Sequence, residues 1–174
     1  MSAIDYDLKN IKAVAFDVDG VLSPSTIPLT VDGEPMRMVN IKDGYAIQLA
    51  VKRGLKMAII TGGNTAAVRV RFAGLGIEDI YLGSAQKLPV LEEWMRKHGL
   101  CREQVAYVGD DIPDLPALRY AGLSCCPYDA AAEVRQVSHY ISRFTGGYGV
   151  GRDILEQILK AQNLWMNDDT AFGW

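Results

Sequence analysis

The sequence has few cysteines and no long apolar run, and these two absences narrow the class of protein. Its 174 residues include three cysteines, two of them adjacent at Cys125 and Cys126, which suits neither a disulfide framework nor a spaced zinc site. We expect these thiols to lie in or near the core. The longest apolar stretches, residues 13–16 and 57–60, are far shorter than the ~20 residues that a membrane-spanning helix needs. A membrane is therefore not an expected partner.

An excess of basic residues is also absent. Lysine and arginine number 18 against 21 aspartates and glutamates, which gives a net charge of −3 at pH 7. Because there is no long run of basic residues, we do not expect nucleic acid as a partner. The acidic first seven residues lack the basic and apolar regions of a secretory signal, so we expect a cytoplasmic protein. With 49% hydrophobic and 22% charged residues, the composition predicts one globular domain over residues 1–174.

Short apolar segments alternate with longer amphipathic ones along most of the chain. This alternation is typical of βαβ units, and it predicts an α/β fold with a doubly wound, mostly parallel sheet. The last helix is expected over residues 150–164, and Asp43 and Asn64 are expected to cap two earlier helices. The expected strands are residues 11–16, 55–60, 80–82, 105–108 and 123–126.

Two segments do not fit this alternation. Residues 23–40 contain two apolar stretches on either side of a turn at residues 31–34, which predicts a β-hairpin flap. The flap is apolar for an exposed ribbon, and we expect it to pack against neighbouring copies of the chain. Residues 165–174 form a polar tail that we expect to be frayed.

Polar residues follow four of the expected strands, at the edge where a parallel sheet binds its ligands. The first strand is followed by two aspartates two residues apart, and the second by a threonine and glycines before a helix. A lysine comes shortly after the third strand, and three aspartates follow the fourth. These residues are Asp17, Asp19, Thr61, Gly62, Lys87, Asp110, Asp111 and Asp114.

Together these residues have the chemistry of a metal and phosphate site. So many carboxylates would repel one another unless a cation lay among them. Since no histidine or cysteine lies among them, a hard cation is favoured, and Mg²⁺ needs few protein ligands. The hydroxyl of Thr61, the amides around Gly62 and the ammonium of Lys87 would bind an anion the size of phosphate. A carboxylate beside such a site predicts phosphoryl transfer through an aspartyl-phosphate.

Each motif alone has a simpler interpretation. Two aspartates two residues apart are common in turns, and a single lysine is usually a solvated surface charge. The aspartates after the fourth strand could cap the helix that follows. All four motifs in this order, each after an expected strand, favour an active site.

Four segments resemble the motifs of the haloacid dehalogenase superfamily. They are Asp17-Val18-Asp19, Thr61, Lys87, and Gly109-Asp110-Asp111 with Asp114. More narrowly, residues 40–45, 105–111 and 146–153 resemble those of the 3-deoxy-D-manno-octulosonate 8-phosphate (KDO 8-phosphate) phosphatases. The resemblance covers nearly the whole chain and implies a Rossmann-like fold without a cap domain.

The resemblance also implies a role for each matching residue. Asp17 would be the nucleophile and Asp19 the general acid/base, with Thr61 and Lys87 acting on the phosphate. Asp17, the backbone carbonyl of Asp19 and Asp110 would hold Mg²⁺, while Asp111 and Asp114 would support them. The active form would be a homotetramer in which a neighbouring subunit covers each site.

Three departures from the family pattern concern the substrate. Gly63 stands where many members have arginine, Tyr148 stands where arginine is frequent, and residues 24–25 replace the usual Asp-Gly. Lys42 is a candidate for binding a sugar-acid carboxylate. Arg71 is a candidate replacement for the missing cation, although an outward-facing solvated arginine would explain it equally well.

We therefore predict a Mg²⁺-dependent phosphatase for a small phosphorylated sugar acid, with KDO 8-phosphate of lipopolysaccharide precursor synthesis as the first candidate. A nine-carbon nonulosonic acid 9-phosphate is the alternative substrate. A non-catalytic phospho-acceptor module is a weaker alternative, because an acid/base at Asp19 serves a long-lived acyl-phosphate badly. Asp19 also argues against a dehalogenase, and the short interval between Asp19 and Thr61 argues against a phosphomutase with a cap.

Overall fold

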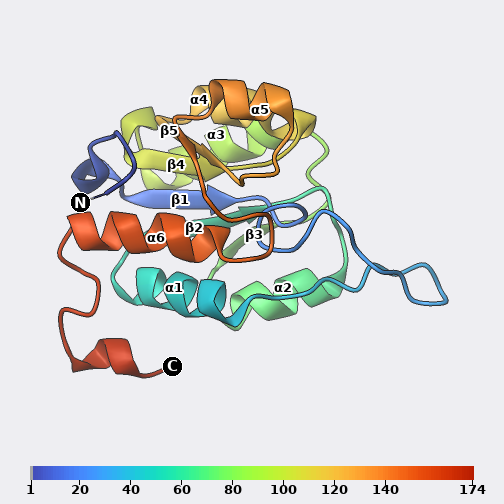
Figure 1. Ribbon diagram of the computed structural model, residues 1–174, viewed down its shortest axis with the longest axis horizontal. Helices are drawn as coiled ribbons and strands as arrows, with labels where there is room; N and C mark the ends of the chain where they lie inside the picture. Colours follow the sequence, from blue (N-terminus) through green and yellow to red (C-terminus); the bar gives the residue numbers. More distant parts are fainter. Residues whose placement is uncertain (1) are drawn as a thin grey trace.

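Six parallel strands form the centre of the protein, whose computed structural model describes residues 2–174. The strands lie in the order β3-β2-β1-β4-β5-β6, and every neighbouring pair is parallel (Figure 1). The strand order reverses at β1, where an open α/β sheet forms its ligand crevice. The strands are β1 (Ala13–Phe16), β2 (Lys56–Ile60), β3 (Asp79–Tyr81), β4 (Val105–Val108), β5 (Leu123–Cys126) and β6 (Tyr140–Ile141). The predicted doubly wound sheet is confirmed.

Helices cover both faces of the sheet (Figure 1). Helices α1, α2 and α6 lie below it in this view, and α3, α4 and α5 lie above it. The helices are α1 (Ile41–Lys52), α2 (Ala66–Ala73), α3 (Lys87–His98), α4 (Leu115–Tyr120), α5 (Ala132–Val137) and α6 (Val150–Ala161). Single turns of 3₁₀ helix are η1 (Leu8–Asn10), η2 (Arg102–Gln104), η3 (Ile112–Asp114) and η4 (Asp169–Phe172). None of the helices within residues 2–174 is long and apolar enough to cross a membrane.

The strand β1 is buried on both faces, which explains its continuous apolar sequence. Val14 and Phe16 pack in the core beneath α1, α2 and α6, whereas Ala13 and Ala15 pack in the core beneath α3, α4 and α5. Side chains alternate between the two faces because the period of a strand is two residues. This rigid central strand ends directly before Asp17.

The N-terminus of α1 differs from the prediction in a way that bears on the site. Asn40, not Asp43, caps this helix: its side-chain oxygen accepts hydrogen bonds from the backbone N–H groups of Lys42 (2.9 Å) and Asp43 (3.2 Å). The Asp43 side chain is buried and accepts from the backbone N–H of Arg152 (2.7 Å), at the start of α6. Asp43 therefore links α1 to α6.

The flap at residues 23–40 projects from the body of the protein (Figure 1). Its pairing is limited to one antiparallel bridge between Leu29 and Pro35, with the N–H groups of Thr30 and Met36 bonded to Glu34 and Pro28. The predicted hairpin is present, but it lacks two regular strands. Five of its apolar side chains are exposed in the single chain. They are Leu29, Val31, Met36, Met38 and Val39.

The tail at residues 165–174 is not frayed, contrary to the prediction. Trp165 and Ala171 are buried, and the hydroxyl of Tyr45 in α1 donates a hydrogen bond to the carbonyl of Ala171. Arg53 pairs with Asp168 at 3.0 Å. The tail is ordered because its apolar side chains and one ion pair attach it to the end of α1. The expectation that the cysteines lie in or near the core is confirmed for Cys125 and Cys126, which are buried, and is wrong for Cys101, which is exposed.

Candidate active site

The aspartate that follows β1 lies at the centre of the acidic cluster. The Asp17 side chain is buried, and its Oδ2 lies 2.8 Å from the Nζ of Lys87, the first residue of α3. Its other oxygen, Oδ1, has no hydrogen-bond partner among residues 2–174. A buried carboxylate oxygen without a partner is costly, so this atom points to a ligand outside the chain.

Lys87 joins Asp17 to a second buried carboxylate, Asp114. The distance from Lys87 Nζ to Asp114 Oδ1 is 2.7 Å, and the hydroxyl of Tyr107 donates to the same oxygen at 2.7 Å. The backbone N–H groups of Asp110 and Asp111 donate to Asp114 Oδ2 at 3.1 and 3.3 Å. Asp114 therefore holds Lys87 and the loop after β4 in place.

The loop after β4 brings Asp110 against the loop after β1. One oxygen each of Asp17, Asp110 and Asp114 lie within 4.8 Å of one another. A Cβ atom at Gly20 would lie 1.9 Å from Asp110 Oδ2, and Gly20 also has a φ of +87°. Only glycine meets both conditions, which explains the glycine directly after the Asp-Val-Asp sequence.

The electrostatics of this cluster favour a bound cation. Burial, followed by repulsion from Asp17 and Asp114, raises the pKa of Asp110 to about 8. Burial, followed by repulsion from Asp114, raises the pKa of Asp17 despite the nearby ammonium of Lys87. Burial alone would lower the pKa of Lys87, but the charges of Asp17 and Asp114 raise it. One ammonium thus does not neutralise three carboxylates, and a divalent cation would.

The residues present fit Mg²⁺. The donor set contains only oxygen, one oxygen of Asp17 lacks a partner within the described part of the chain, and Asp110 lies beside it. Asp114 is a weaker ligand than the other two, because four donors already occupy its two oxygens. Asp17 and Asp110 are therefore the side chains best placed to hold the ion.

Asp19 lies beside this cluster and is held by a residue that the sequence did not reveal. Arg37 of the flap donates from Nε to Asp19 Oδ1 (2.6 Å) and from Nη2 to Asp19 Oδ2 (2.8 Å). Its Nη1 donates to the hydroxyl of Thr65 at 2.6 Å. Such a bidentate pair fixes the plane of the carboxylate as well as its position.

Tyr107 is the second residue that sequence reasoning missed. The available signal was its position in a buried strand, where a hydroxyl needs a hydrogen-bond partner.

The loop after β2 supplies the hydroxyl and the glycines of the site. Thr61 is buried, and its Oγ1 accepts a hydrogen bond from the N–H of Gly63 (3.2 Å). The carbonyl of Thr61 accepts from the N–H of Ser84 (2.9 Å), which attaches this loop to the one before Lys87. A Cβ atom at Gly62 would meet nothing within 4 Å, so the space beside this residue is open.

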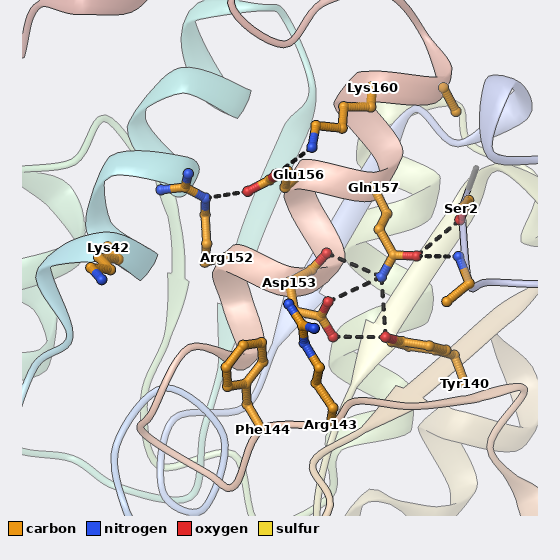
Figure 2. A pocket seen from close by; sticks show the side chains of 12 residues that line it. Ser2, Lys42, Tyr140, Arg143, Phe144, Arg152, Asp153, Glu156, Gln157 and Lys160 are labelled. Carbon is orange, nitrogen blue, oxygen red and sulfur yellow. Dashed lines mark hydrogen bonds and ion pairs between the residues drawn. The ribbon is translucent and has the colours of Figure 1, made fainter.

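Three of the predicted residues contribute no side chain to the site of this chain. Asp111 is exposed and takes part through its backbone N–H. Arg71 lies against Gly44 of α1, in a small depression between α1 and α2. Lys42 lines a cavity of about 720 Å³ next to α6, and none of its lining residues belongs to the acidic cluster (Figure 2). The structure of one chain therefore does not bring Lys42 or Arg71 to Asp17.

The cavity beside Lys42 contains several basic side chains. Figure 2 shows Arg152 and Lys160 both turned toward Glu156, whose oxygens they contact at 2.6 and 2.5 Å. Lys42 forms no ion pair within residues 2–174. Its ammonium is therefore available to an external anion.

Comparisons with known proteins identify the family of this chain. Residues 40–122 match the family model of the haloacid dehalogenase-like hydrolases. The chain is 38% identical over 154 residues to 3-deoxy-D-manno-octulosonate 8-phosphate phosphatase KdsC of Escherichia coli strain K12, covering 88% of this chain and 82% of that protein.

Two solved structures are also similar to this chain. The phosphatase of the same name from Moraxella catarrhalis, in complex with magnesium ion, phosphate ion and KDO, has a TM-score of 0.87 and 40% identity, covering 90% of each chain. The cobalt-bound form of the enzyme from Haemophilus influenzae has a TM-score of 0.89 and 32% identity, covering 95% of this chain and 98% of that one. These similarities show that the chain belongs to the 3-deoxy-D-manno-octulosonate 8-phosphate phosphatase family, phosphoric monoester hydrolases of the haloacid dehalogenase type.

Proposed function

We propose that this protein hydrolyses KDO 8-phosphate to KDO and phosphate in the cytoplasm, as a step of lipopolysaccharide precursor synthesis. The observation that carries the proposal is the oxygen of buried Asp17, beside Asp110 and Lys87, that has no hydrogen-bond partner in residues 2–174. The relatives that bear this name, and the related structure that contains KDO, support the choice of substrate.

In the first step, Asp17 attacks the phosphorus atom. A bond forms between a carboxylate oxygen of Asp17 and phosphorus, while the bond from phosphorus to the sugar oxygen breaks. Asp19 gives a proton to the departing sugar oxygen, and the ammonium of Lys87 offsets negative charge on the phosphoryl oxygens. The product of this step is an aspartyl-phosphate on Asp17.

In the second step, water attacks the phosphorus atom of this intermediate. Asp19, now a carboxylate, takes a proton from the water, and Asp17 departs with its original oxygens. Asp17, the backbone carbonyl of Asp19 and Asp110 would hold Mg²⁺. When bound, the ion offsets charge on the phosphoryl oxygens and orients them for in-line attack. Thr61 and the amides near Gly62 complete the phosphate receptor.

The active form in this proposal is a homotetramer. The exposed apolar side chains of the flap, such as Leu29, Met36 and Met38, would be buried between subunits. The site of one chain lies at an open sheet edge, and cover from a neighbour would exclude water and help select the sugar. Lys42 and Arg71, which lie away from the cluster in one chain, remain candidate ligands for the sugar-acid carboxylate.

The test is phosphate release from a panel of substrates, with and without Mg²⁺. KDO 8-phosphate should give the highest kcat/KM, above a nonulosonic acid 9-phosphate and above glucose 6-phosphate. The Asp17→Asn variant serves as the control for contaminating phosphatases. Equal efficiency on KDO 8-phosphate and glucose 6-phosphate would defeat the substrate assignment. A preference for the nine-carbon acid would replace it with the alternative.

A further inference from the structure

The guanidinium of Arg37 is enclosed although it comes from an exposed flap. Its side chain is 11% exposed, whereas the neighbouring Met36 and Met38 are about half exposed. Three of its nitrogens donate hydrogen bonds, two to Asp19 and one to Thr65. These partners belong to the loops after β1 and β2. A single side chain therefore connects the flap to two of the loops that form the active site.

The residue at position 63 leaves room for this guanidinium. A Cβ atom at Gly63 would lie 2.5 Å from Nη2 of Arg37 and 3.5 Å from Oδ2 of Asp19. The φ of Gly63 lies outside the left-handed region, so its backbone does not itself require glycine. The space is needed because any side chain there would push Arg37 away from Asp19.

The hydroxyl of Thr65 also binds Arg37. It occupies the N-cap position of α2, where a threonine hydroxyl usually accepts from the helix backbone. Here it makes no such capping bond and accepts from Nη1 of Arg37 instead. The hydroxyl thus fixes the far side of the guanidinium.

We propose that Arg37 is a positioning residue for the acid/base Asp19, and that Gly63 is small because Arg37 needs its space. This rests on the proposed function, in which Asp19 gives its proton to the sugar oxygen as the bond from that oxygen to phosphorus breaks. A carboxylate has about four lone-pair sites, and Arg37 occupies one on each oxygen. The remaining sites stay open toward the substrate, with the plane of the carboxylate fixed.

The test separates protonation of the leaving group from binding of the substrate. A sugar alkoxide needs a proton to leave, whereas the phenolate of p-nitrophenyl phosphate leaves without one. The first turnover reports only the first step, in which Asp17 attacks and the leaving group departs, since the later hydrolysis of the intermediate does not enter it. We would measure first-turnover rates with KDO 8-phosphate, glucose 6-phosphate and p-nitrophenyl phosphate, in the presence of Mg²⁺.

The variants are Arg37→Met, Arg37→Lys and Gly63→Ala, with Arg119→Met on the exposed face of α4 as the matched control. Displacement of a positioned group by about 1 Å can cost about 10²-fold in rate. We expect Arg37→Met and Gly63→Ala to slow both sugar phosphates by about this factor and p-nitrophenyl phosphate by less than about threefold. Arg37→Lys keeps the positive charge but loses the bidentate hydrogen bonding of the guanidinium. Its rates on the sugar phosphates should lie between those of these variants and of the wild type.

The two sites should also be coupled. Because Gly63→Ala acts by displacing the same guanidinium, the double variant should be no slower than Arg37→Met alone. Equal losses on all three substrates would overturn the proposal, since they would mean a phosphate ligand or a structural role. A loss of rate confined to KDO 8-phosphate would also overturn it, since Arg37 would then be a ligand for the carboxylate of the sugar acid. Unchanged or faster rates would leave Arg37 without a positioning role. A wild-type enzyme inactive on KDO 8-phosphate but active on glucose 6-phosphate would refute the proposed substrate alone, and the Arg37 comparison would then use glucose 6-phosphate.

Discussion

Replacing Lys87 with methionine should strongly destabilise the metal-free protein. The Lys87 side chain is 6% exposed, and its ammonium lies 2.8 Å from Asp17 and 2.7 Å from Asp114. Methionine fills a similar volume but leaves these two carboxylates and Asp110 without a cation. Removing one partner of a buried ion pair typically costs about 3–5 kcal/mol of unfolding free energy. We expect a loss in this range for Lys87→Met.

The matched control lies at the other end of the same helix. Lys97 also pairs with an aspartate, Asp79, but its side chain is 54% exposed. Because solvent screens an exposed pair, Lys97→Met should change the stability little. Mg²⁺ should stabilise Lys87→Met more than the wild type, since the cation would replace the missing positive charge.

The assay is urea unfolding followed by circular dichroism, at one protein concentration, with a chelator and then with Mg²⁺. Turnover of Lys87→Met should be lost under both conditions, because the ion does not replace the ammonium at the phosphate. If Lys87→Met unfolded at the same urea concentration as Lys97→Met in the chelator, the buried charge network would not carry the stability that we assign to it.

Four further predictions follow from the same site. Asp17→Asn should abolish turnover and leave the fold intact, as checked by circular dichroism. Asp19→Asn should lower kcat by a factor of roughly 10² to 10⁴. A rate near that of the wild type in either variant would contradict the role assigned to that residue. Activity should disappear in a chelator, return with Mg²⁺ and return poorly with Ca²⁺, which takes longer bonds and more ligands. The folded-state pKa of Asp110 is raised from 3.8 to about 8, so the folded metal-free protein holds a proton that the unfolded chain releases. The stability of the metal-free protein should therefore fall as the pH rises across this range, while the rise in Tm caused by Mg²⁺ should grow. A Mg²⁺-induced rise in Tm that is independent of pH would refute this. Light scattering at assay concentration should find a tetramer, and a fully active monomer would exclude cover by a neighbour.

The parts of the fold that the sequence predicted are those with strong local patterns. Strands β1, β2, β4 and β5 are mostly apolar because both of their faces are buried along nearly their whole length. By contrast, β6 has two residues and α5 has six, which is too short for a periodic pattern to stand out. The tail was misjudged because its polar sequence conceals Trp165 and Ala171, whose burial depends on α1.

The active-site residues also divide into those with a local sequence signal and those without one. Asp17, Thr61, Lys87 and Asp110 could be predicted because each follows a strand of a parallel sheet, where ligands bind. Arg37 could not, since the flap carries no periodic signal and its contact with Asp19 depends on how the flap folds back.

The spatial positions of two further residues could not be predicted from the sequence. Gly63 was visible as a departure from the family pattern, but its relation to Arg37 appears only in three dimensions. Conversely, Lys42 has the right chemistry for a carboxylate ligand and lies away from the acidic cluster of its own chain.

The central claim is that Asp17 forms a covalent bond to phosphorus during turnover. The most direct measurement is to quench the reaction in acid, reduce it with borohydride and map the modified residue by mass spectrometry. Borohydride converts an aspartyl-phosphate to homoserine. With p-nitrophenyl phosphate, whose phenolate leaves without a proton, Asp19→Asn should accumulate the intermediate because only its hydrolysis is slowed. We predict homoserine at position 17 alone, dependent on both substrate and Mg²⁺. An unmodified Asp17 under conditions of measurable turnover, or homoserine at another aspartate, would contradict the account.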